Sequence, residues 1–170
     1  MPDMISNSNG IPFNGLLIND TSTLCPVSKA VLPIVRHFLN ALSQPNSFGW
    51  RIAQTIAVGT WGEARGLAIA YDTQKFLTAL LLYRKVPLSF NDPLNLELRD
   101  QLQNDEVAIL NLLIAMQADK TAQARVCVLY LTQGQMRADV VKSALILAKR
   151  LEFNTSNLNT RKRPTLRIIK

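Results

Sequence analysis

The chain has 170 residues, with 19 Lys and Arg against 12 Asp and Glu, and a formal net charge of +7. A hydrophobic fraction of 48% suits a globular protein and excludes general disorder. Its apolar runs are far shorter than the roughly 20 residues of a transmembrane helix. The N-terminus lacks the basic start and apolar block of a secretory signal, so we expect a cytoplasmic protein without membrane contact.

The charge is concentrated at the C-terminal end of the chain. Residues 142–170 contain eight basic residues and one acid, a net +7, whereas residues 1–141 contain 11 basic and 11 acidic residues. The eight basic residues are Lys142, Lys149, Arg150, Arg161, Lys162, Arg163, Arg167 and Lys170. The excess charge therefore belongs to one helix face and a tail, attached to a neutral body.

Residues 1–22, rich in Asn, Ser and Gly, predict an irregular segment. A first helix is expected to begin between Thr23 and Ser28 and to run to Leu42, with Pro33 bending it or marking its true start. Asn46 or Ser47 is expected to cap a second helix. Its glycines predict either a break near Gly59-Thr60 or a face, shared by residues 53, 57, 62, 66 and 70, where another backbone comes close.

A third helix is expected to end near Arg84-Lys85, before Pro87. Leu94 to Leu102 fits a short helix, although residues 94–99 also alternate like a strand. Asn104-Asp105-Glu106 predicts the start of a helix that is apolar all round and therefore central.

Asp119 is expected to cap the next helix, which Gly134 ends. The last helix is predicted over residues 135–153, with Val140, Ala144, Leu147 and Leu151 on its apolar face.

These elements predict an all-α fold: a compact bundle of six or seven helices with short connections. The bundle is expected over residues 23–153, after an irregular segment (1–22) and before a basic tail (154–170).

No catalytic or cofactor motif stands out in the sequence. Walker, GxGxxG, HExxH and CxxC patterns are absent, and the single histidine, His37, cannot build a metal site alone. Cys25 and Cys127 are too few for a zinc framework and are expected to be buried, reduced thiols. We therefore expect a protein that is not an enzyme and uses no cofactor, metal or small-molecule substrate.

Clustered Lys and Arg favour nucleic acid as a partner, because they release counterions from phosphate backbones whatever the base sequence. An acidic protein partner and a merely solvated tail are the alternatives. The tail also ends in Leu166, Ile168 and Ile169, which suit either an edge strand added to a neighbour or docking onto the chain's own bundle.

Trp50 and Trp61 are eleven residues apart, which places both on one face of an unbroken helix. With Arg51 and Arg65 they would form a platform for stacking bases. The favoured interpretation is a core or subunit contact, because Trp buries a large area.

In size, helicity, basicity and lack of catalytic motifs, residues 23–153 resemble the helical small subunit of multi-subunit CRISPR effector complexes. The resemblance implies a non-catalytic subunit that repeats along a complex and contacts DNA or RNA backbone without reading bases. Its backbone-contacting residues in the body would be Arg51, Arg65, Arg84, Lys85, Arg125 and the basic residues from Lys142 to Arg150. The neutral body departs from this pattern, since a bundle that grips nucleic acid is expected to be more basic.

Two other functions fit the same features. One is a viral or phage structural protein, in which the helical body packs against copies of itself and a basic arm neutralises the genome. The other is an adaptor that binds only proteins.

Overall fold

The computed structural model describes residues 21–151. Most of the predicted N-terminal irregular segment and the whole predicted basic tail lie outside them. A short 3₁₀ turn (Thr21–Thr23) is followed by α1 (Pro26–Ser43), α2 (Gly49–Trp61), α3 (Glu63–Leu81), α4 (Asn104–Gln117), α5 (Thr121–Leu131) and α6 (Ala138–Leu151). The prediction of an all-α bundle is confirmed. None of these helices is long and apolar enough to cross a membrane.

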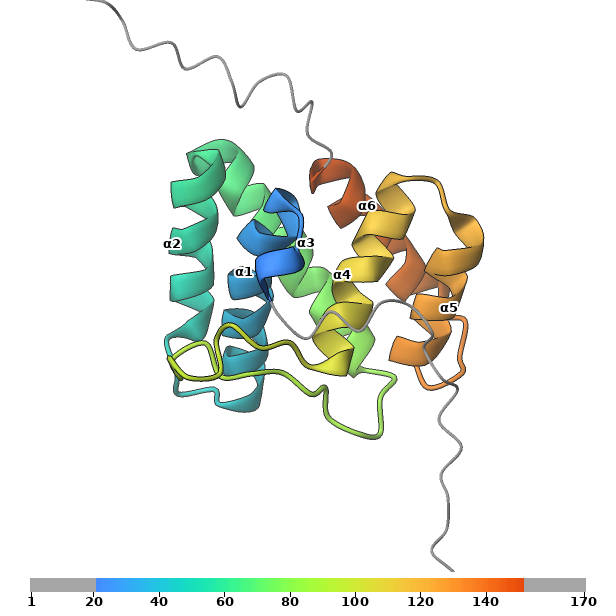
Figure 1. The fold of residues 1–170 in the computed structure, drawn as a ribbon, viewed down its shortest axis with the longest axis horizontal. Helices are drawn as coiled ribbons and strands as arrows, with labels where there is room; N and C mark the ends of the chain where they lie inside the picture. The colour runs from blue at the N-terminus through green and yellow to red at the C-terminus, as the bar shows by residue number, and fades with distance from the viewer. Residues whose placement is uncertain (1–20, 152–170) are drawn as a thin grey trace, which may run out of the picture.

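The helices form two neighbouring groups of three (Figure 1). α1, α2 and α3 pack on one another, and α4 packs against both α5 and α6. α3 lies along α6 and α1 touches α4, so one apolar core runs through both groups. Among its fully buried side chains are Phe38, Phe76, Ile109, Leu112 and Leu147.

α2 and α3 approach closely at Gly66, as one of the two interpretations of the glycines predicted. A Cβ atom placed on Gly66 would lie 2.5 Å from the carbonyl oxygen of Ala57, so no larger residue fits without moving the backbone. The break between the helices comes at Gly62, whose φ of 81° favours glycine, and α2 continues through Gly59. α1 likewise continues through Pro33.

The second half of the bundle is arranged around α4. Most of its side chains from Asp105 to Leu113 are buried, as the apolar pattern predicted for a central helix. The predicted faces of α6 are also confirmed. Val140, Ala144, Leu147 and Leu151 are buried, and Lys142, Lys149 and Arg150 are exposed.

The predicted helix near residues 94–102 is wrong, because the chain from Leu82 to Gln103 forms turns and loops. The Asp92 carboxylate accepts the backbone N–H of Leu94 at 2.9 Å, and the Asn95 side chain accepts that of Glu97 at 3.0 Å. Such side-chain bonds stabilise turns at the expense of helix. α3 accordingly ends at Leu81, before the predicted boundary.

Asp119 does not begin α5 but ends α4. Its φ is 53°, and the N–H of Lys120 reaches back to the carbonyl of Ala115 at 2.8 Å, which is the pattern of a Schellman motif. α5 ends in the same way, with Gln133 (φ 55°) in the left-handed position and the N–H of Gly134 bonded to the carbonyl of Leu129 at 2.7 Å. Gly134 thus follows the residue that turns the chain.

Candidate functional site

α3 and α6 lie antiparallel, which brings the first turn of α3 to the last turn of α6. At one end of the pair, Tyr83 donates a hydrogen bond to the Asp139 carboxylate at 2.6 Å. At the other end, Arg65 donates to the carbonyl of Arg150 at 2.9 Å. Arg65 therefore satisfies one of the last carbonyls of α6, where a cation also meets the negative end of the helix dipole.

Exposed cations gather on α6 and at this second end of the pair. We call Lys142, Lys149, Arg150 and Arg65 the α6 basic face. Lys142 and Lys149 lie two turns apart on the same side of α6, and no acid follows Asp139 in that helix. Arg150 also pairs through Nε with the carboxylate of Asp72, a buried residue of α3, and its side chain stays 41% exposed. The pairing holds one guanidinium at the surface.

Other predicted contact residues lie on separate surfaces. Arg51 is exposed on α2, which packs on α1 and α3, and Arg125 is exposed on α5, which packs on α4. Arg125 lines the mouth of an apolar cavity of about 250 Å³ between α4, α5 and α6. Lys85 is exposed just after α3, and its backbone N–H bonds to the Gln133 side chain at 3.1 Å. The structure does not bring these three residues to the α6 basic face.

The prediction that Arg84 faces phosphate requires a correction, because its side chain is only 6% exposed. The guanidinium donates to the carbonyl of Leu131 at 2.8 Å and lies 3.3 Å from the Asp105 carboxylate. The same carboxylate accepts the N–H and hydroxyl of Ser89 at 2.7 and 3.0 Å. Arg84 therefore ties the chain after α3 to α4 and α5. Arg161, Lys162, Arg163, Arg167 and Lys170 lie outside the described residues.

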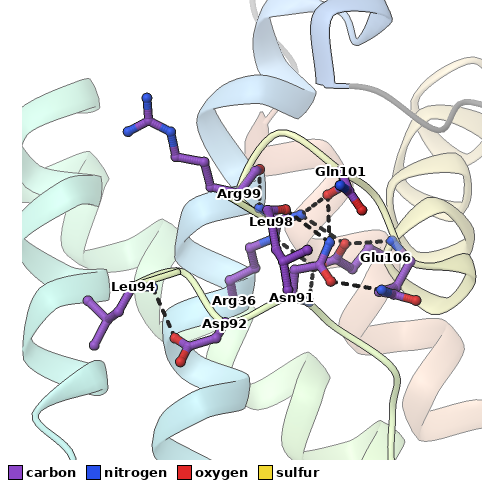
Figure 2. Close-up of polar contacts among 9 residues, drawn as sticks. Arg36, Asn91, Asp92, Leu94, Leu98, Arg99, Gln101 and Glu106 are labelled. Atoms are coloured by element: carbon purple, nitrogen blue, oxygen red, sulfur yellow. Dashed lines mark hydrogen bonds and ion pairs between the residues drawn. The ribbon is translucent and has the colours of Figure 1, made fainter. Parts of the chain in front are cut away.

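A buried ion pair that was not predicted joins α1 to α4 (Figure 2). The Arg36 guanidinium contacts both oxygens of Glu106, at 2.6 and 3.0 Å, and the two side chains are 4% and 0% exposed. Arg36 also donates to the carbonyls of Arg99 and Gln101, at 2.5 Å each. This bidentate geometry uses the whole fork of the arginine.

Asn91 extends the ion pair into the loop. Its N–H donates to Glu106 at 3.2 Å, and its amide donates to the carbonyls of Leu98 and Gln101 at 3.2 and 2.8 Å. Glu106 further accepts the N–H of Gln103 at 2.9 Å, which caps α4. Arg36 could have indicated this ion pair, because it lies among the apolar residues of its helix and a buried cation needs a partner.

His37, the next residue of α1, is buried beside this network. Its Nδ1 atom is enclosed and has no hydrogen-bond partner among the described residues. An unsatisfied buried polar atom costs about 1–3 kcal/mol. Burial lowers the pKa of His37 below its ordinary value of 6.5, against the opposing charge of Asp92. The imidazole is therefore neutral near pH 7.

The two cysteines differ in environment. Cys127 is buried, and desolvation raises the pKa of its thiol to about 11, so the thiol is protonated and inert. Cys25 is exposed, contrary to prediction, and its sulfur lies 3.1 Å from the Ser28 hydroxyl. No group of three or more metal-ligating side chains occurs within residues 21–151.

The two tryptophans lie on the unbroken α2, as the spacing required, but differ in burial. Trp61 is partly buried and packs against the core, whereas Trp50 is exposed. Phe48 and Ile52 are exposed nearby in sequence, so the beginning of α2 carries uncovered apolar surface.

Comparisons of the chain with protein-family models, with curated proteins and with solved structures each find no match.

Proposed function

We propose that this chain is a non-catalytic helical subunit of a larger nucleoprotein assembly and contacts nucleic-acid backbone without base specificity. The observation that carries the proposal is the α6 basic face. Three of its four exposed cations lie on α6, and the basic residues from Arg161 to Lys170 follow that helix in the sequence. Charge contributed in this way binds phosphate whatever the bases are.

The pairing of charges in the described residues supports binding by the C-terminal end rather than by the body of the bundle. Arg36 and Arg84 are each matched by a buried carboxylate, so neither contributes to the outward field. Exposed cations therefore carry the attraction, and α6 itself contains no acid after Asp139, although Arg150 pairs with Asp72 of α3. A surface of this kind steers a polyanion toward one side of a molecule.

Exposed apolar side chains support the assembly part of the proposal. Phe48 and Trp50 lie at the start of α2, and Leu94 and Leu96 lie in the loop before α4. Apolar groups exposed in this number favour contacts with other protein subunits or copies of the chain. The α6 basic face and these apolar groups would then serve different partners, as in the small subunit of CRISPR effector complexes that the sequence resembles.

The test is fluorescence anisotropy with single- and double-stranded DNA and RNA over a range of salt concentrations. If about five phosphates are neutralised, the log–log slope of affinity against salt is roughly −3.5 to −4.5. Replacing Lys142 and Lys149 by Met is expected to reduce the slope by about 1.4 to 1.8, which corresponds to two phosphates. Replacing Lys75 and Lys120 removes the same charge from other exposed positions and serves as the matched control.

Changing the five basic residues of 161–170 to Gln in the full chain measures the share of the tail. A loss of affinity in this variant alone would assign binding to the tail, and a loss in both variants would assign it to the α6 basic face and the tail together. Affinity that does not depend on salt, or an equal effect of the Lys75/Lys120 control, would contradict the proposal.

A further inference from the structure

A second cavity, of about 270 Å³, lies between α1 and the loop before α4. Lys29, Pro33 and His37 line it from one side of α1, where they are spaced by four residues. Arg99 and Asp100 line it from the loop, and the N–H of Thr21 closes one edge by bonding to the carbonyl of Asp100 at 3.0 Å. No residue of α6 contributes, so this cavity is separate from the α6 basic face.

His37, which lines the cavity, has a ring nitrogen without a protein partner in the described part of the chain. His37 is 7% exposed, and its Nδ1 has no hydrogen-bond partner among the described residues. A neutral imidazole has one N–H donor and one acceptor nitrogen. Because Nδ1 is enclosed, an oxygen atom of a ligand in the cavity would be bound through Nε2, with the imidazole as donor or acceptor.

Two cations at the rim of the cavity are available to a ligand. Arg36 also lines the cavity, but Glu106 neutralises it. The Arg99 guanidinium points away from the buried network (Figure 2) and lies 3.8 Å from Asp100 in an exposed contact that water screens. Lys29 is exposed, and its ammonium donates to the carbonyl of Ser22 at 2.9 Å. With Asp100 counted, the lining keeps one net positive charge.

We propose that this cavity binds a phosphate group, held by Lys29 and Arg99 at the rim and by Nε2 of His37. Arginine binds phosphate through two parallel N–H groups, and lysine adds a point charge. A phosphate group has more acceptor oxygens than a carboxylate, so it can accept hydrogen bonds from three donors at once. The volume lies below the usual range for drug-sized ligands and suits a single phosphate group. The site does not depend on the function proposed above.

The single histidine makes a direct experiment possible, because imidazole signals in the NMR spectrum of the full chain come from His37 alone. We expect inorganic phosphate, added at constant ionic strength and pH, to shift the His37 ¹⁵N resonances in a saturable way. The double variant Lys29→Met/Arg99→Met is expected to weaken this binding at least tenfold. A matched variant, Lys75→Met/Arg51→Met, removes the same charge elsewhere and is expected to bind as the wild type does.

The amide spectrum of each variant checks that it is folded. Absence of a saturable shift, an equal shift with chloride, or unchanged binding by the Lys29/Arg99 variant would overturn the proposal.

A mononucleotide and a short single-stranded oligonucleotide distinguish the sources of the phosphate group. A His37 shift with the mononucleotide alone assigns the site to phosphate monoesters, and a shift with both assigns it also to nucleic-acid backbone. The Lys142→Met/Lys149→Met variant is expected to keep the response of His37 to inorganic phosphate. Failure of nucleic-acid binding and failure of this site are therefore observed separately.

Discussion

Two regions each contain an arginine paired with a carboxylate, but in opposite surroundings. One is the contact between α1 and α4, and the other is the α6 basic face. Between α1 and α4, the side chains of Arg36 and Glu106 are 4% and 0% exposed, and every nitrogen of the guanidinium is bonded. On α6, Arg150 keeps 41% of its side chain in water. The first arrangement holds two helices and a loop together, and the second keeps charge at the surface. Burial of the pair, rather than the residue type, separates an arginine that holds helices together from an arginine whose charge reaches solvent.

This comparison predicts that the cost of losing an arginine falls as its ion pair becomes more exposed. Arg36→Met leaves the Glu106 carboxylate buried without its counter-charge, and we expect a loss of about 3–5 kcal/mol of unfolding free energy. Urea denaturation followed by circular dichroism measures it. The double variant Arg36→Met/Glu106→Gln is expected to recover part of the loss, since no buried charge remains. A loss below about 1 kcal/mol in the single variant would contradict a structural role for the pair.

Arg84→Met is expected to cost somewhat less, about 3 kcal/mol, because Asp105 keeps its two hydrogen bonds from Ser89 after the arginine is lost. The same denaturation experiment measures the cost. Nucleic-acid affinity is the second measurement, and it should be unchanged under conditions where the variant is folded. A loss of nucleic-acid affinity in the folded variant would indicate that Arg84 contacts nucleic acid after all.

Arg150→Met is expected to cost about 1–2 kcal/mol, since the hydrogen bond to the buried Asp72 carboxylate is lost but water reaches the site. Arg99→Met is the control, because its contact with Asp100 is exposed on both sides and its removal should change stability little. If Arg150→Met cost as much stability as Arg36→Met, the exposure of an ion pair would not explain how much stability its loss costs.

The smallest expected effect on stability concerns His37, which lies beside the Arg36–Glu106 network, and it depends on pH. Its pKa in the folded chain lies below 6.5, so the unfolded chain takes up a proton at higher pH than the folded chain does. The stability that depends on neutral His37 is therefore complete above pH 6.5 and is lost as pH falls through the lowered pKa. In phosphate-free buffer, His37→Asn is expected to lose less stability than the wild type between about pH 7.5 and about pH 5. Equal losses in both proteins would contradict the lowered pKa.

The helical elements could be predicted because their signals are local. Apolar spacing marked α1, α4 and α6, and the small residues at 57 and 66 marked a close contact that the structure contains. The loop before α4 could not be predicted in this way. Leu94, Leu96 and Leu98 have the spacing of an ordered element, but the bonds of Asp92 and Asn95 to the backbone favour turns.

By itself the sequence determined the fold class, the central position of α4 and the concentration of positive charge after residue 141, because composition and periodicity depend only on neighbours along the chain. Only the tertiary structure decided which arginines are buried. Arg36 and Glu106 are 70 residues apart, and Arg84 and Asp105 are 21 residues apart. Whether a cation meets a carboxylate or water depends on which helices pack together. The charge of a residue alone does not determine that packing.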